Sequence, residues 1–220
     1  MSNPGSAFEA PAPYVDPPAR LGVLLSGRGS NFTALAEACR QGLLPASVAL
    51  VISDRPDAAG LVKAQEMGIP AAAVDRKLYE ARDDHEERVA ALLEESGTGI
   101  VCLAGYMRIL SPAFVDRFRL RILNIHPSLL PSFPGKEAQA QALAYGARVT
   151  GVTVHFVDAG TDTGPIVAQE AVLVEPSDTV AILSARLLEV EHRIYRRALN
   201  DVLRGGWVLN GRSVSFSPSG

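Results

Sequence analysis

Cysteine, basic charge and long apolar runs are all scarce in this sequence. Its 220 residues include two cysteines, Cys39 and Cys102, in apolar stretches without metal-ligand spacing, so we expect both to be buried hydrophobic residues and expect no bound metal. The formal net charge of -3 lacks the basic footprint of a nucleic-acid-binding protein. No apolar run reaches the roughly 18 residues that a membrane-spanning helix needs. These absences argue against nucleic-acid and membrane partners and fit a reducing, cytoplasmic setting.

Residues 1–19 are rich in proline and alanine and poor in large aliphatic side chains. They lack the basic region and apolar run of a signal peptide, and we expect a disordered leader. Hydrophobic residues make up 47% of the chain, which is enough for a sizeable core in one large domain.

Short apolar runs alternate with amphipathic stretches in the first part of the chain. Strands are expected at residues 21–26, 48–53, 71–74, 100–104 and 121–126. Helices are expected at 33–41, 58–67, 83–95 and 112–119. Continuously apolar strands separated by helices predict a parallel sheet that is covered on both faces.

The pattern changes from about residue 137. We expect a helix at 137–145, antiparallel strands at 150–157 and 166–174, a long helix from an Asp178 cap to Leu203, and a hairpin at 207–216. The sequence therefore predicts an α/β fold: a doubly wound, Rossmann-like, mostly parallel sheet with an antiparallel C-terminal extension. Ligands of such sheets bind beyond the carboxyl ends of the strands.

The loop Ser26-Gly-Arg-Gly-Ser-Asn31 links the first expected strand to the first expected helix. Its glycines let a ligand approach the backbone amides, and a helix N-terminus with free amides is an anion site. Ser30 and Asn31 can cap the helix. The loop matches neither a dinucleotide-binding nor a Walker sequence, so phosphate binding and an ordinary capped turn both stay open.

Asn124 and His126 lie two residues apart in the fifth expected strand, so their side chains face the same way. Pro127 ends regular pairing, which leaves both side chains at the carboxyl end of the strand. The next residues include two further prolines and Gly135, which stiffen the loop. Together these features favour a functional pair over a purely structural histidine.

A carboxylate partner for this pair is expected in the segment between the two later strands. Asp158 and Asp162 are both candidates, and either could instead bond its own turn. His155 lies in a strand pattern, and we favour a supporting role for it. An amide, an imidazole and a carboxylate suit acid-base chemistry at a carbonyl. Because no Ser or Cys lies in a nucleophile elbow, the nucleophile is expected to come from the substrate.

Several segments together resemble the folate-dependent formyltransferase family. They are residues 26–31, 103–112, 124–131, 151–155, 162–165 and 191–192. The resemblance covers residues 20–210 and implies one formyltransferase domain, with nucleotide and phosphate binding in its N-terminal half and the folate and catalytic loop in its C-terminal half. Residues 211–220 would form a tail or hairpin end. Within the family, the set is most similar to members that formylate 5-phosphoribosylglycinamide in de novo purine biosynthesis.

The resemblance also implies a reaction and its residues. The substrate amine attacks the formyl carbon of the co-substrate 10-formyltetrahydrofolate directly, through a tetrahedral intermediate and without a metal. The implied catalytic residues are Asn124, His126 and Asp162, supported by His155. The implied substrate-binding residues are Gly29, Ser30, Asn31 and Glu191. The implied folate-binding residues are Arg82, Met107, Arg108, Ile109, Leu110 and Asn124. Small-molecule partners and a monomer or homodimer are expected.

Glu137 departs from the family pattern, because many relatives carry a histidine a few residues after the Pro-Gly of this loop. Within the family, the alternatives are a sugar-nucleotide formyltransferase and a formyltetrahydrofolate hydrolase. A tRNA-formylating enzyme usually carries a further nucleic-acid-binding domain. Outside the family, a non-catalytic nucleotide-binding module stays open, and an NAD-linked oxidoreductase is disfavoured by the missing GxGxxG sequence.

Overall fold

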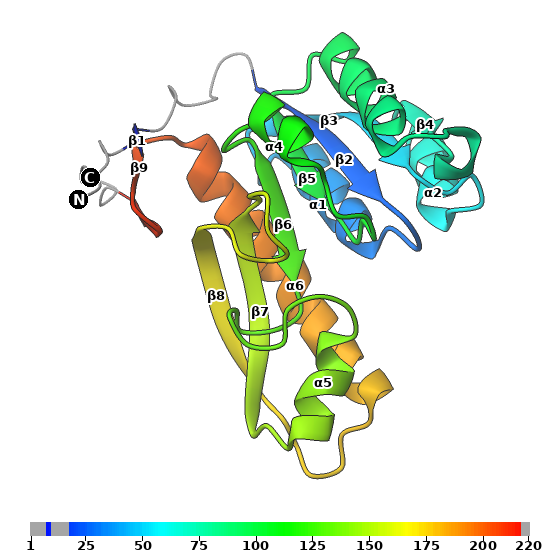
Figure 1. Cartoon of the computed structure of the whole chain (residues 1–220). Coiled ribbons are helices and arrows are strands. Elements are labelled where there is room, and N and C mark those ends of the chain that lie inside the picture. Colours follow the sequence, from blue (N-terminus) through cyan, green and yellow to red (C-terminus); the bar gives the residue numbers. More distant parts are fainter. Residues whose placement is uncertain (1–7, 10–17, 217–220) are drawn as a thin grey trace.

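The computed structural model describes residues 8–9 and 18–216 of the chain (Figure 1). The strands are β1 (Phe8–Glu9), β2 (Ala19–Leu25), β3 (Ala46–Ser53), β4 (Ala71–Ala73), β5 (Ile100–Leu103), β6 (Ile122–His126), β7 (Val149–Phe156), β8 (Ile166–Leu173), β9 (Trp207–Asn210) and β10 (Ser213–Phe216). The helices are α1 (Ser30–Arg40), α2 (Ala59–Glu66), the 3-10 helix η1 (Arg76–Leu78), α3 (Arg82–Glu95), α4 (Pro112–Arg117), α5 (Ala138–Tyr145) and α6 (Val180–Leu203).

The strands form one sheet in the order β1-β9-β10-β8-β7-β6-β5-β2-β3-β4. The pairs β2–β3, β2–β5, β3–β4 and β5–β6 are parallel. Residues such as Leu21 and Val23 pack on one face with α1, α2 and α6. Leu24 and Ile52 pack on the other face with α3 and α4. Helices on both faces explain why these strands are continuously apolar, and the doubly wound parallel sheet is confirmed.

The sheet changes direction at β7. This strand pairs antiparallel with both β6 and β8. Strands β9 and β10 form a hairpin, and β10 runs parallel to β8. The expected antiparallel extension and terminal hairpin are therefore confirmed.

Helix α6 supports both parts of the sheet and crosses it diagonally, from beside α5 to the start of β9 (Figure 1). Its buried stripe comprises Leu183, Leu187, Val190, Ile194, Tyr195, Ala198, Leu199, Val202 and Leu203. This stripe of three- and four-residue spacing lets the helix pack against α1, β6, β7 and β8. The expected Asp178 cap is wrong, because Arg186 pairs with that carboxylate. Thr179 caps instead, by accepting from the backbone amide of Ile182.

The expected leader contains two residues that join the sheet. Phe8 and Glu9 pair antiparallel with β9, and the Phe8 ring stacks on Trp207 with 5.8 Å between the ring centroids. Ala19, the last residue of that segment, already belongs to β2. The rest of the expected leader up to residue 17, and residues 217–220 of the expected tail, lie outside the described residues.

The two cysteines differ in burial. Cys102 is buried as expected, whereas Cys39 is only half-buried in α1. Burial raises the pKa of Cys39 to about 11 and that of Cys102 to about 12, so both thiols stay protonated near neutral pH. Among the residues that the structure describes, no His, Cys, Asp and Glu side chains gather as a metal site. The helices of this part are too short or too polar to cross a membrane.

Candidate active site

Asn124 and His126 lie at the carboxyl end of β6. Asn124 is paired with His155 of β7, and His126 with Thr153. The His126 residue is 4% exposed, and Asn124 is half-buried. Both side chains contact the same carboxylate, so they face the same side of the sheet, as their spacing predicts.

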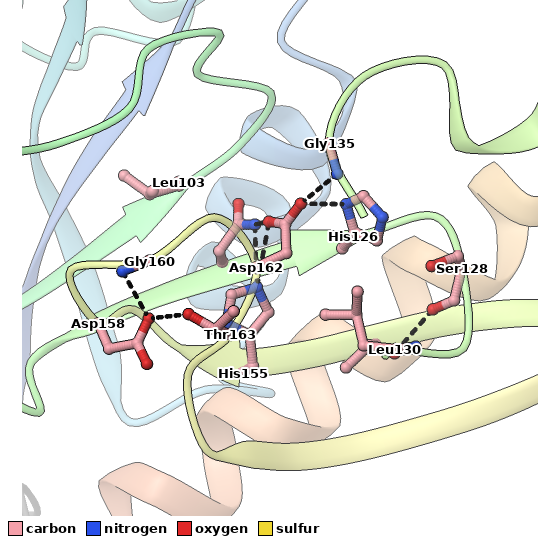
Figure 2. A network of polar contacts seen from close by, with 12 residues as sticks. Leu103, His126, Ser128, Leu130, Gly135, His155, Asp158, Gly160, Asp162 and Thr163 are labelled. Carbon is pink, nitrogen blue, oxygen red and sulfur yellow. Dashed lines mark hydrogen bonds and ion pairs between the residues drawn. The ribbon is translucent and has the colours of Figure 1, made fainter. Parts of the chain in front are cut away.

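That carboxylate belongs to Asp162, in the loop between β7 and β8. Its Oδ2 lies 3.4 Å from Nδ1 of His126, and its Oδ1 accepts from the Asn124 side-chain amide at 3.4 Å. The backbone amide of Gly135 donates to Oδ2 at 2.7 Å. Figure 2 shows Asp162 between Gly135, His126 and His155. One carboxylate thus joins the end of β6, the proline-containing loop and the β7–β8 loop.

The structure distinguishes Asp162 from Asp158, which spacing alone does not. Oδ1 of Asp158 accepts from the Gly160 amide at 3.1 Å and from the Thr163 hydroxyl at 2.6 Å, so this side chain closes its own turn (Figure 2). Asp162 has a backbone φ of 54°, in the left-handed region that non-glycine residues rarely occupy. This backbone conformation turns the Asp162 carboxylate towards β6.

A backbone carbonyl orients the ring of His126. Nε2 lies 2.9 Å from the Phe133 oxygen, so Nε2 carries the proton that this carbonyl accepts. Nδ1 therefore faces Asp162. The Ser128 hydroxyl donates to the Ser132 oxygen at 2.5 Å and contacts the Phe133 oxygen at 3.4 Å. Hydrogen bonds thus hold the loop in addition to its prolines.

His155 orients the amide of Asn124 from a buried position. Its Nδ1 donates to the Phe156 oxygen at 2.8 Å, which leaves Nε2 of the neutral ring as an acceptor. The Asn124 amide donates to Nε2 at 3.2 Å and to Asp162 at 3.4 Å. Because both amide protons are engaged, Asn124 can donate to a ligand only when one contact opens, and the longer contact to Asp162 is the weaker one.

The surroundings of Asp162 favour its charged form. Burial acts to raise the pKa of Asp162, but hydrogen bonding to His155 and Gly135 and the charge of His126 outweigh it, so the pKa lies below its usual value. The Gly135 bond at 2.7 Å is the stronger of the two, because His155 Nε2 lies 3.7 Å away and donates only from a doubly protonated ring. Asp162 is therefore a carboxylate at neutral pH.

The glycine-rich loop leads into α1 without a side-chain cap. Gly29, with φ of 70°, is the N-cap, so the expectation that Ser30 and Asn31 cap the helix is wrong; they are its first residues. A Cβ on Gly29 would lie 2.9 Å from Cα of Gly60, so glycine permits this close packing against α2. The first amides of α1 receive no side-chain acceptor, which suits an anionic ligand.

Asn31 and Glu191 meet beside this helix end. The Asn31 amide donates to Oε2 of Glu191 at 2.6 Å, and the buried Oδ1 of Asn31 has no partner within the described part of the chain. Burial raises the pKa of Glu191, against the lowering effect of the Asn31 hydrogen bond. An unpartnered buried acceptor next to a half-buried carboxyl group favours a ligand that donates hydrogen bonds.

A cleft of about 320 Å³ lies between α3 and the segment after β5. It is lined by Arg76, Arg82, His85, Glu86, Tyr106, Met107, Arg108, Ile109 and Lys136. Met107 and Ile109 are 57% and 61% exposed, whereas Leu110 is buried. Lys136 follows Gly135, whose amide donates to Asp162. The cleft therefore borders the trio of Asn124, His126 and Asp162. Its cations suit an acidic ligand, and its exposed apolar side chains suit a flat one.

Several groups that hold these residues are not singled out by the sequence. Glu86 accepts from Arg82 at 2.9 Å and from the Ser111 amide at 3.1 Å. Glu86 is one of several charged residues in its helix, so the sequence does not single it out. The Phe133 carbonyl that binds His126 is a backbone group, which every residue has, so no sequence pattern points to it. Glu137, the departure from the family pattern, is exposed and forms the N-cap of α5 with φ of 58°.

Known proteins resemble this chain over most of its length. The human trifunctional purine biosynthetic protein adenosine-3 is 49% identical over 187 residues, which cover 85% of this chain and 18% of that protein. The phosphoribosylglycinamide formyltransferase of Bacillus subtilis is 38% identical over 184 residues, covering 84% of this chain and 94% of that enzyme. The chain thus spans less than a fifth of the length of the trifunctional relatives.

A solved structure agrees with these relatives. The crystal structure of glycinamide ribonucleotide transformylase 1 from Symbiobacterium toebii has a TM-score of 0.88 and 49% identity, covering 90% of this chain and 93% of that one. The profile of the formyl transferase family matches residues 19–199. The chain therefore belongs to the formyl transferase family.

Proposed function

We propose that this protein transfers the formyl group of 10-formyltetrahydrofolate to the amine of 5-phosphoribosylglycinamide, forming formylglycinamide ribonucleotide in de novo purine biosynthesis. The observation that carries the proposal is the convergence of Asn124, His126 and Asp162 next to a cation-lined cleft. The Bacillus subtilis relative is named for this activity. The formyl-folate is consumed in the reaction and is therefore a co-substrate.

The ribonucleotide is assigned to the start of α1. Gly29, Ser30 and Asn31 present backbone amides to its phosphate, where the helix dipole also favours negative charge. Glu191 accepts from a ribose hydroxyl, and its contact with Asn31 orients both side chains before the ligand arrives.

The folate is assigned to the cleft beside the trio. The backbone of residues 107–110 offers donors and acceptors to the edge of the pterin, and Met107 and Ile109 offer exposed apolar surface. Arg82, in the lining of the same cleft, suits the carboxylates of the folate tail. The cations and the exposed apolar side chains of the lining therefore fit an anionic, partly flat co-substrate.

The reaction is a direct transfer between two nitrogens. The amine nitrogen of the ribonucleotide forms a bond to the formyl carbon, and the bond from that carbon to the folate nitrogen breaks. One proton leaves the attacking amine, and one reaches the departing folate nitrogen. Charge grows on the formyl oxygen in between, and hydrogen-bond donors placed there lower the barrier.

His126 and Asn124 supply those donors. Asn124 donates to Asp162 only through a long contact of 3.4 Å, and Nδ1 of His126, which carries a proton when the ring is doubly protonated, lies at the same distance from that carboxylate. A negatively charged formyl oxygen therefore competes well for both protons. A donor of this kind typically contributes about 2.7–4 kcal/mol. Asp162 stabilises the charged ring of His126 and, as a carboxylate, accepts the proton of the attacking amine through water.

Three alternatives share parts of this site. A formyltetrahydrofolate hydrolase or a sugar-nucleotide formyltransferase would use the same trio, but the Asn31–Glu191 contact beside the free amides of α1 favours a ribonucleotide acceptor. A non-catalytic nucleotide-binding module would keep the α1 site without needing three converging polar side chains at β6.

The test is a direct assay with the purified chain. We expect tetrahydrofolate to appear when both 5-phosphoribosylglycinamide and 10-formyltetrahydrofolate are present, and not when the ribonucleotide is omitted. Release without the ribonucleotide would indicate the hydrolase. Nucleotide binding with no turnover would indicate the module and overturn the proposal.

A further inference from the structure

Asp54 lies at the carboxyl end of β3, outside the site residues described so far. Its residue is 3% exposed. Oδ1 accepts from the Ser26 hydroxyl at 2.5 Å, and Oδ2 accepts from Nε of Arg108 at 2.7 Å. A buried carboxylate therefore connects β3 to the end of β2 and to the segment that lines the cleft.

Ser26 extends this connection to the backbone of the same segment. Its own amide donates to the Gly105 oxygen at 3.0 Å, and its hydroxyl oxygen accepts from the Met107 amide at 2.9 Å. Residues 105–108 are thus fixed at three points by one Ser26–Asp54 pair.

The far end of the segment is fixed separately. Arg82 donates to the Ile109 oxygen at 2.5 Å, and Glu86 accepts from the Ser111 amide at 3.1 Å. The side chains of Met107 and Ile109 are mostly exposed and contribute little apolar packing that would hold the backbone. Tyr106 and Leu110 on either side are packed in the core, so it is the backbone between them that depends on these polar contacts, and Asp54 provides the buried charge among them at the β5 end.

We propose that Asp54 is a positioning residue for the formyl-folate: through Arg108 and Ser26 it fixes the backbone of residues 105–108 before the co-substrate binds. The inference rests on the proposed function, because it assigns the folate to this cleft. A segment that is ordered in advance loses less entropy on binding, so Asp54 acts on folate affinity without touching the folate.

The variant Asp54→Asn tests this, because it keeps the shape and one acceptor but removes the charge. Hydrogen bonds to charged groups are strong enough that we expect about a tenfold weaker affinity for tetrahydrofolate by calorimetry. The KM for 10-formyltetrahydrofolate should rise by a similar factor, with kcat and the KM for the ribonucleotide nearly unchanged. Hydrogen exchange at the Met107 amide, which donates to Ser26, should be faster.

Asp57→Asn is the matched control, since Asp57 forms an exposed ion pair with Arg55 a few residues further on. It should leave folate affinity and amide exchange unchanged. Arg108→Gln should reproduce the effect of Asp54→Asn, and the double variant should add little to either. If Asp54→Asn does not fold, Arg108→Gln and Ser26→Ala decide by the same readouts.

The inference and the proposed reaction fail in different ways. Unchanged folate affinity and unchanged exchange in Asp54→Asn and Arg108→Gln would overturn the positioning role, whatever the enzyme turns over. An equal loss in the affinities for both substrates would indicate general destabilisation and would overturn it too. Weaker tetrahydrofolate binding in variants of a protein that shows no transfer would support the positioning role while rejecting the reaction.

Discussion

The side-chain amide of Asn31 donates to Glu191 across 2.6 Å and so ties the first turn of α1 to the middle of α6. The two residues lie 160 positions apart in the sequence, and this contact brings their side chains together. The Glu191 carboxyl group, which we propose binds the ribose, therefore lies next to the backbone amides of α1, which we propose bind the phosphate.

Glu191→Gln should weaken ribonucleotide binding selectively. The variant replaces a charged acceptor by a neutral one, and hydrogen bonds to charged groups contribute about 1.5–3 kcal/mol. We expect KM for 5-phosphoribosylglycinamide to rise about tenfold or more, with KM for 10-formyltetrahydrofolate unchanged, in steady-state assays that vary each substrate. Glu189→Gln, on the exposed side of the same helix, is the control. Equal effects of the two variants would contradict the assignment.

The same residue should impose a pH dependence on stability. Burial raises the pKa of Glu191 in the folded protein, so the folded state keeps this proton where the unfolded chain, with a pKa near about 4.3, has lost it. The contribution of Glu191 to stability is therefore lost as pH rises through this window. Urea unfolding should show Glu191→Gln to be more stable than the natural chain at pH 7, by a margin that shrinks towards pH 4. A margin independent of pH would rule this out.

His126→Ala and Asn124→Ala should each lower kcat far more than they change KM. Removing one oxyanion donor typically costs about 100- to 1,000-fold in rate. Single-turnover measurements with both substrates bound would separate the chemical step from binding, and circular dichroism would check that the fold is intact. Near-normal turnover in both folded variants would show that these residues have no catalytic role.

Asp162→Asn should lose activity, whereas Asp158→Asn should not. Loss of a positioned proton acceptor costs about 100-fold or more, and Asp158 only closes its own turn. Because the pKa of Asp162 is lowered, this carboxylate stays ionised from pH 5 to 8. Any acid limb of the kcat profile in that range should therefore persist in the residual activity of Asp162→Asn. Disappearance of the limb in this variant would assign it to Asp162 after all.

The residues whose positions could be predicted from the sequence are those that follow the periodicity of a strand or a helix. Asn124 and His126 share a face because strand side chains alternate, and Pro127 indicates where β6 ends. The helices on both sides of the sheet follow from apolar periodicity. In these places the local pattern and the tertiary structure require the same conformation.

The residues that could not be placed depend on competition between distant groups. Asp178 has the composition of a cap, but Arg186 takes its carboxylate. Asp162, rather than Asp158, reaches His126 because its backbone is left-handed in the β7–β8 loop. The sequence of that turn does not predict this conformation. Asp54 follows the end of a strand, where polar residues often contribute to a site. Its partner Arg108 is far away in the sequence and is brought next to it only by the fold of the sheet.

Helix α6 has a consequence for how this protein accommodates its ligands. It packs on α1 and on β6, β7 and β8, so it links both halves of the sheet, and we expect the two halves to move as one body. Adjustment on binding is then restricted to the loops at the strand ends. Specificity would then arise mainly from the fit between the ligand and a preformed surface. A ligand too bulky for that surface would not bind, because the domain would not rearrange around it.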